Sequence, residues 1–356
     1  MQCENTTPTA AYVHVANPDD TDRVMTVSVK ATFFVNDDGR VELDRKDPLP
    51  IEIADRETDF GVFPQDIMPT KGSVFEVFCL GQAHAPGQNP VQQMDVEMTV
   101  GETSQRLRVS GDRHWTSIEE DPRISEPEPF STMPILWENA FGGTSEVWID
   151  RESAVDIRHP LNPFGKGFDP RPQAGELKIG LPEGYPIFPT ELPLPNIESP
   201  DELVTAPLDQ PMPRCFAPIP LMSPLHMKQF VEFPNSLDEG EILPQVDRNR
   251  VNSRAASEWR LPIPNARTRV SLLGMTSDGE LSFELPEVRF LIDYIFGEKE
   301  GTTELIPQRL MLLPEERRFY LLFKDFFSFS FIEEMERCIR VRMEEGWYTT
   351  NQGGLS

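Results

Sequence analysis

The residues in this sequence best suited to acid–base chemistry are Asp112 and His114, two positions apart in the segment GDRHW at 111–115. In a β-strand, residues i and i+2 face the same side, so a carboxylate and an imidazole at this spacing can pair as a general acid and base. Glu138, in WENAF at 137–141, is a third candidate, because a carboxylate among aromatic side chains can have a raised pKa. A β-rich hydrolase that uses these residues therefore remains an alternative.

The sequence offers no motif that would complete such a site. It contains no G-x-S-x-G elbow, no Walker phosphate loop, no G-x-G-x-x-G after a strand and no H-E-x-x-H. The five histidines share no metal-ligand spacing and the four cysteines form no CxxC pair, so we expect no metal and no cofactor. We expect a protein that is not an enzyme, with hydrogen-bonding and turn-forming roles for its motif residues. These structural residues are Asp112, Arg113, His114, Trp115, Glu138, Gly142 and Gly143.

The surrounding segment, residues 111–168, is rich in aromatic residues, glycine and proline, and holds three of the five tryptophans. Aromatic side chains supply large apolar areas, and glycines allow tight turns. We therefore expect one compact aromatic cluster that forms a rigid recognition platform rather than a reaction centre. The residues expected to contact a partner are Trp137, Phe141, Phe164, Phe168, Leu194 and Ile197.

Residues 119–224 contain many of the 35 prolines in the chain and show little regular periodicity. A hundred residues of plain loop would be unusual in a compact domain, so this region should wrap over a sheet and be held by its aromatic side chains. Its apolar residues either face a partner or pack inward, and the sequence leaves both open. These residues are Leu192, Leu194, Ile197, Leu221 and Met222.

The chain carries 59 acidic and 33 basic side chains, a formal charge of −26. This charge disfavours binding to nucleic acid and to anionic membranes, and it steers a basic partner toward the protein. The first twenty residues lack the basic start and apolar run of a signal peptide, and no stretch approaches eighteen uninterrupted apolar residues. We therefore expect a cytoplasmic protein with reduced cysteines and no membrane contact.

Strand-type alternation predicts the fold class. Residues 23–35 alternate polar and apolar side chains, and turn formers at 36–39, 101 and 277–279 join strands into hairpins. Further strands are expected at 73–80, 287–296, 318–331 and 338–343, and a short helix is considered at 244–259. The prediction is a mainly β fold, with antiparallel sheets arranged as a sandwich or a curved sheet, long Pro/Gly-rich wrapping loops and few short helices.

We divide the chain into a β-rich region at 1–118, a Pro/Gly/aromatic-rich region at 119–260 and a second β-rich region at 261–356. The first and the last are expected to pack together as one large unit. A chain of 356 residues is long enough for either one large β-rich unit or two packed units.

Six motifs, taken in order, resemble a bacterial family. They are VKATF at 29–33, GQAHAP at 81–86, GDRHW at 111–115, PFSTMPILWENAFGG at 129–143, NPFGKGF at 162–168 and LPNIE at 194–198. The family resembled is a domain family of unknown function, encoded beside type VI secretion spike and toxin genes, whose members act as effector adaptors or chaperones. The segment at 215–230 departs from the family, because it lacks the usual tryptophan.

The resemblance implies a cytosolic, non-enzymatic protein that binds a toxin effector and helps to load it onto a VgrG-type spike protein. The family has no catalytic residues to carry over. Besides the hydrolase, a phage-tail-like structural component remains a second alternative.

Overall fold

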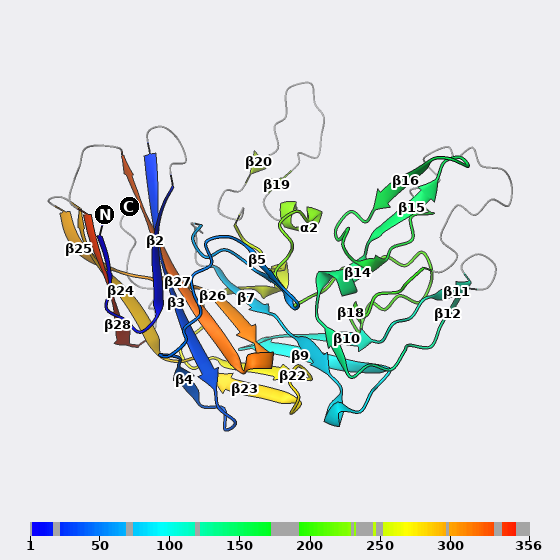
Figure 1. Cartoon of the computed structure of the whole chain (residues 1–356), viewed down its shortest axis with the longest axis horizontal. Coiled ribbons are helices and arrows are strands. Elements are labelled where there is room, and N and C mark those ends of the chain that lie inside the picture. The colour runs from blue at the N-terminus through cyan, green and yellow to red at the C-terminus, as the bar shows by residue number, and fades with distance from the viewer. Residues whose placement is uncertain are drawn as a thin grey trace, which may run out of the picture.

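The structure is a computed structural model that describes most of the chain. The described residues are 2–16, 22–68, 74–117, 122–171, 192–228, 231–232, 245–246, 252–296, 299–330 and 337–346. Strands dominate them, which confirms the mainly β prediction, and helical structure is limited to short pieces such as α2 (Pro224–Met227). Figure 1 shows the strands gathered into large sheets, with smaller hairpins to one side.

The largest sheet has seven strands, and its long central strands come from both ends of the chain. Its order is β2 (Ala10–Ala16), β3 (Asp22–Val35), β27 (Arg318–Ser330), β26 (Ile306–Leu313), β7 (Val74–Cys79) and β21 (Arg260–Pro262), and β4 (Val41–Leu43) pairs with β3. The pairs are antiparallel except for β26 and β7, which run parallel.

Two further sheets accompany it. The five-stranded sheet has the order β18 (Ile197–Glu198), β10 (Thr103–Ser110), β9 (Gln93–Val100), β22 (Arg269–Leu273) and β23 (Glu280–Glu284). The four-stranded sheet has the order β1 (Gln2–Asn5), β28 (Arg337–Glu345), β24 (Val288–Phe296) and β25 (Lys299–Glu304). Strands from residues 1–118 and 261–356 are therefore neighbours in all three sheets.

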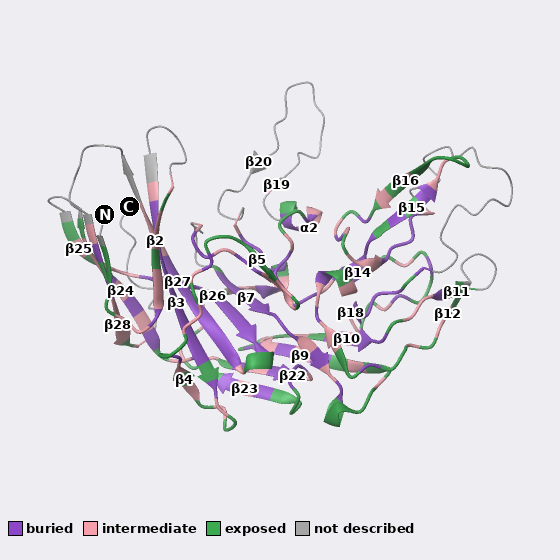
Figure 2. Ribbon diagram, in the orientation of Figure 1, coloured by how far each residue is buried: buried purple, intermediate pink, exposed green. Residues whose placement is uncertain are grey.

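The main core lies where these sheets pack face to face, as in a β-sandwich. Phe319 of β27 stacks between Phe33 of β3 and Phe283 of β23, with ring centroids 5.1 and 4.5 Å apart. Phe323, four residues further along β27 on the same face, contacts Phe290 of β24, with ring centroids 4.8 Å apart. Figure 2 shows the resulting buried band through the centre of the molecule.

The central region adds short two-stranded pieces joined by loops. They are β8 (Gln82–His84) with β13 (Thr132–Pro134), β11 (Trp115–Ser117) with β12 (Arg123–Ile124), β14 (Phe141–Gly142) with β17 (Lys166–Gly167), β15 (Thr144–Trp148) with β16 (Ala154–Arg158), β5 (Arg56–Thr58) with β6 (Gly61–Phe63), and β19 (Val231–Glu232) with β20 (Gln245–Val246).

The local sequence signals for hairpins are confirmed. The turn at 36–39 joins β3 to β4, the turn at Gly101 joins β9 to β10, and the turn at 274–279 joins β22 to β23. Gly39 and Gly101 adopt positive φ angles of 79° and 60°, which glycine adopts without strain. The strand predicted at 338–343 lies within β28. Residues 172–191, in the proline-rich region at 119–224, lie outside the described residues.

The helix considered at 244–259 is wrong for the described part of that segment, which contains β20 and a single 3₁₀ turn at Ser257–Trp259. Long-range contacts determine its path. The Trp259 indole donates to Gln105 Oε1 at 2.7 Å, and the backbone N–H of Arg254 donates to Glu76 at 2.9 Å. A helix would withdraw these groups from their partners on the sheets.

Adjacent phenylalanines on β3 test the sandwich core. Phe33→Ala, which empties a buried site beside Phe319, should lower the free energy of unfolding by about 3–5 kcal/mol. Phe34→Ala, on the opposite face of the strand, removes a side chain that is 39% exposed and should cost about 1 kcal/mol or less. Urea unfolding followed by tryptophan fluorescence measures both. Equal losses would contradict the assignment of the core face.

Candidate functional site

One face of the seven-stranded sheet is polar and nevertheless buried. On β3, Ser28, Lys30 and Thr32 alternate with the apolar residues of the core face, and all three are buried. An antiparallel strand with this alternation commonly leaves its polar side to solvent. Here the neighbouring strands add Lys324 and Arg309 to the same buried face.

Residues 44–68, here called the strap, contact this polar face at several points. Near the beginning of the strap, Asp44 pairs with Arg318 at 2.8 Å. In the middle, the backbone N–H of Leu49 donates to Thr32 Oγ1 at 2.9 Å. At the end, Lys324 Nζ donates to the carbonyl of Met68 at 3.1 Å. The strap is therefore held on the sheet by hydrogen bonds and ion pairs, and apolar packing adds to them where Phe63 stacks on Tyr320 of β27.

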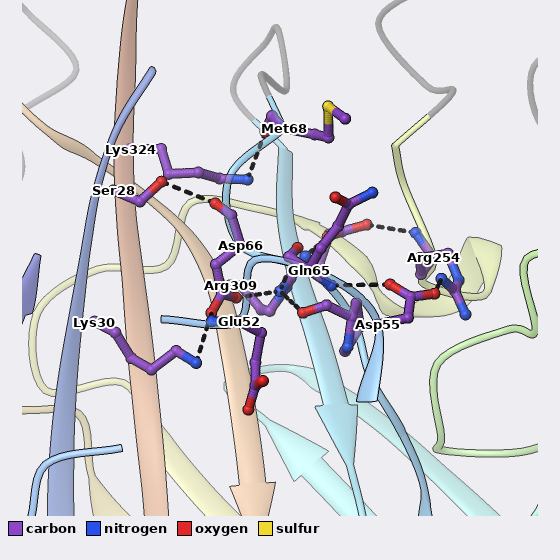
Figure 3. Close-up of polar contacts among 12 residues, drawn as sticks. Ser28, Lys30, Glu52, Asp55, Gln65, Asp66, Met68, Arg254, Arg309 and Lys324 are labelled. Atoms are coloured by element: carbon purple, nitrogen blue, oxygen red, sulfur yellow. Dashed lines mark hydrogen bonds and ion pairs between the residues drawn. The ribbon is translucent and has the colours of Figure 1, made fainter. Parts of the chain in front are cut away.

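Asp66 of the strap is the centre of the network (Figure 3). One carboxylate oxygen lies 2.5 Å from Lys30 Nζ and the other lies 2.8 Å from Arg309 Nη1. The backbone N–H of Glu52 also donates to the carboxylate, and Ser28 Oγ donates to the Asp66 carbonyl, both at 2.8 Å. A fully buried carboxylate thus faces two cations and a backbone donor, which offsets its loss of hydration.

Glu76 of β7 connects this network to the segment that follows β20. It lies 3.6 Å from Arg309 Nη2 and accepts hydrogen bonds from Ser253 Oγ at 2.7 Å and from the N–H of Arg254. Arg254 in turn pairs with Asp55 of the strap at 2.5 Å (Figure 3). The segment after β20 is therefore tied to both the sheet and the strap.

Burial changes the acid–base properties of this face. Burial, together with the charge of Arg309, lowers the pKa of Lys324 to about 7, against the attraction of Glu76 and Asp66. Burial also lowers the pKa of Lys30, and Asp66 opposes that change. The pKa of Tyr320, whose ring lies 4.5 Å below Lys30 Nζ, is raised above its usual range, mainly by burial.

These perturbed groups suit a structural role better than a reaction centre. Perturbed pKa values cluster at active sites, but buried structural ion pairs produce them as well. Asp66, Lys30 and Arg309 face one another with almost no exposed surface, so a substrate would have no access to them. Among the described residues, no three His, Cys, Asp or Glu side chains gather closely enough to hold a metal ion.

The acid–base candidates Asp112 and His114 have separate partners. The Asp112 carboxylate accepts from Asn196 Nδ2 at 3.0 Å and remains largely exposed, whereas His114 Nδ1 lies 3.4 Å from Ser125 Oγ. The backbone of 111–115 pairs with the segment 192–196, as in the bond from the N–H of Trp115 to the Leu192 carbonyl at 2.9 Å. Glu138 is exposed. These contacts correspond to the loop-holding role.

Other motif residues carry structural contacts of the expected kind. Arg113 forms an ion pair with the buried Glu198, whose pKa is raised mainly by burial although Arg113 opposes that change. Gly142 and Gly143 have φ angles of 140° and 113°, and a Cβ at Gly142 would lie 2.1 Å from the Asn162 carbonyl oxygen. Only glycine allows this close approach of the two chain segments.

The predicted partner-contact residues require a correction. Five of the six are buried inside the protein, because they fill its cores: Trp137, Phe141, Phe168, Leu194 and Ile197. Phe164 alone is exposed. Leu192 is buried as well, whereas Leu221 and Met222 are exposed.

The aromatic residues also form two clusters rather than one. Trp137 and Phe130 belong to the main core, and the Trp137 indole donates to the Ala217 carbonyl at 3.0 Å. Trp115 and Phe141 form a separate small core with Leu192, Leu194 and Val204. The aromatic side chains therefore stabilise two parts of the structure.

The sequence does not single out the residues of the polar face. The available signal is a lysine in the interior of a strand rich in apolar residues, as at Lys30 in VKATF and Lys324 in LLFKDFF. Lys and Arg are almost never fully buried unless they are paired, so such positions indicate either an exposed strand face or a buried partner. Asp66, the partner here, lies in a loop without periodicity and could not be assigned to them.

Together these features define a β-sandwich protein in which a charged strap covers one sheet. The chain belongs to a bacterial family, DUF2169, described as an uncharacterized protein conserved in bacteria, and the family match spans residues 20–324. This span includes the strap and most of both larger sheets. No curated protein and no solved structure matches the chain. No described helix combines the length and the apolar character needed to cross a membrane.

The network predicts a large cost for removing its central anion. Asp66→Asn leaves Lys30 and Arg309 buried with reduced compensation, so the free energy of unfolding should fall by about 3–5 kcal/mol. Asp38→Asn, which changes an exposed carboxylate paired with Arg40, should leave stability almost unchanged. Chemical denaturation compares the two, and a neutral Asp66→Asn would contradict the role assigned to Asp66.

The lowered pKa of Lys324 predicts a pH dependence of stability. Between its folded pKa of about 7 and its ordinary value near 10.4, the unfolded chain binds more protons than the folded protein, so stability rises with pH. The slope contributed by Lys324 is at most about 1.4 kcal/mol per pH unit.

Lys324→Met should therefore flatten the pH dependence between pH 7 and 8.5. Lys30 acts in the same direction but is present in both proteins. Urea unfolding at several pH values measures the two slopes. Identical slopes would contradict the lowered pKa of Lys324.

Proposed function

We propose that this protein is an adaptor of a type VI secretion system that binds a toxin effector in the cytoplasm and helps to load it onto a VgrG-type spike. In this role it catalyses no reaction. Two observations support the proposal at the level of the whole chain: the ordered motif series at 29–198, which resembles that of effector adaptors, and membership of a bacterial family over residues 20–324.

The observation that carries the proposal is a group of exposed apolar side chains around α2, here called the α2 surface: Leu221, Met222, Met227 and Phe164. Met222 is the most exposed of them, at 80%. Ser223 Oγ and the N–H of Leu225 both donate to the Leu161 carbonyl, at 3.0 and 3.2 Å, which fixes α2 against the loop that carries Phe164.

Such a surface suits a protein partner. Contiguous exposed apolar side chains mark interaction sites, and methionine adapts its shape to different partners. The formal charge of −26 adds a long-range attraction for a partner with basic surface, which speeds association more than it strengthens the complex. In this proposal the α2 surface supplies apolar anchors for the toxin, and the acidic field guides the encounter.

A charge on the α2 surface should disrupt toxin binding. Leu221→Glu combined with Met222→Glu should reduce co-purification with the toxin encoded beside the gene by at least tenfold, because each carboxylate would lose its hydration in the complex. Leu273→Glu, which places one carboxylate at an exposed leucine on β22, is the control and should bind normally. Thermal unfolding verifies that the variants fold.

Two results would contradict the proposal. One is a gene deletion that leaves toxin stability and toxin delivery unchanged. The other is turnover of a defined small molecule by the purified protein that His114→Ala abolishes without unfolding it, since this would favour the hydrolase alternative.

A further inference from the structure

The strand β2 forms an open edge of the seven-stranded sheet. Within the part of the chain that the structure describes, β2 pairs with β3 on one side and with no strand on the other. None of its seven residues is buried, and Tyr12 is 41% exposed. The outer backbone N–H and C=O groups of an edge strand are free to pair with another strand.

Other edge strands carry features that discourage such pairing, and β2 does not. β25 reads KEGTTE, β23 begins and ends with glutamate, and β21 ends with Pro262. Charged residues and proline at an edge oppose the addition of a further strand. In contrast, β2 reads AAYVHVA, without aspartate, glutamate, lysine, arginine or proline.

The sequence of β2 is also complementary to itself. When two copies run antiparallel about Val13, Val13 faces Val13, Tyr12 faces His14 and Ala11 faces Val15, and the terminal alanines face each other. Each pair joins apolar or aromatic side chains, which favour cross-strand contact, and no like charges meet. Val13 and Ala11 pack on the main core, so their pairs would continue the apolar face of the sheet.

We propose that β2 pairs antiparallel with β2 of a second copy of this chain, so that a two-fold axis at Val13 joins two seven-stranded sheets into one. A self-complementary patch of this kind produces a closed dimer rather than a fibre. The pairing is independent of the toxin-binding role proposed for the α2 surface.

The first test measures the oligomeric state of the purified full chain by sedimentation velocity over a range of micromolar concentrations. The wild-type protein should form a dimer. Tyr12→Lys, which introduces a charge on the pairing edge, should shift it to monomer, with at least a tenfold weaker dimer dissociation constant. Ile295→Lys is the matched control, because Ile295 is 46% exposed but lies on β24, between two paired strands. This control should remain a dimer.

The second test fixes the register. In a background of Cys3→Ser and Cys338→Ser, which removes the two cysteines that are not fully buried, Val13→Cys should form an intermolecular disulfide on addition of a mild oxidant. The two thiols would face each other directly across the axis. Ile295→Cys in the same background should not cross-link.

A wild-type monomer, or a dimer that Tyr12→Lys leaves unchanged, would overturn the proposal. A dimer in which Val13→Cys fails to cross-link would overturn the register and with it the two-fold axis at Val13. A monomer that pairs β2 only with a strand of the toxin would equally overturn it. Far-ultraviolet circular dichroism confirms that each variant keeps its β structure.

Discussion

The covered polar face of the seven-stranded sheet depends on the contacts of Asp66 with Lys30 and Arg309, because these contacts allow the strap to lie over a charged sheet face. A single buried charge would be very costly, whereas one carboxylate between two cations, with a backbone donor beside it, has its lost hydration largely replaced. Buried ion pairs often contribute little net stability compared with apolar packing. Here the ion pairs fix the position of the strap, because Asp66 can contact both Lys30 and Arg309 only when it lies between them.

The same network positions the surface on which the proposed function depends. Glu76 receives hydrogen bonds from Ser253 and Arg254, and Arg254 exchanges backbone and side-chain hydrogen bonds with Ile219. Ile219 is buried, and the exposed Leu221 and Met222 follow it after Pro220. The ionic contacts on the sheet are thus connected, through three hydrogen-bonded segments, to the start of the α2 surface. A broad recognition surface needs such a rigid support, because ordering a loose segment on binding would cost affinity.

Local sequence signals predicted much of the sheets and little of what covers them. The alternation in β3 and the glycine in the turn at 36–39 are patterns of residues that are adjacent in the chain. Strands and hairpins of this kind could therefore be assigned from the sequence. The ion pairs of the polar face could not, because Asp66 lies 36 residues from Lys30 and 243 residues from Arg309 in the chain. The helix considered at 244–259 was wrong for the same reason, since contacts with Glu76 and Gln105 override local preference.

The burial of the aromatic motifs explains why recognising them does not locate the binding surface. In NPFGKGF, the buried amide of Asn162 donates to the carbonyls of Trp137 and Phe141, at 2.8 and 3.0 Å. In LPNIE, the buried amide of Asn196 donates to the Ser110 carbonyl at 3.0 Å. These asparagines donate hydrogen bonds to backbone carbonyls where irregular segments cross. Any buried loop needs such partners for its backbone polar groups. The motifs therefore describe how the central region is assembled, and they contain only Phe164 of the four exposed side chains in the proposed α2 surface.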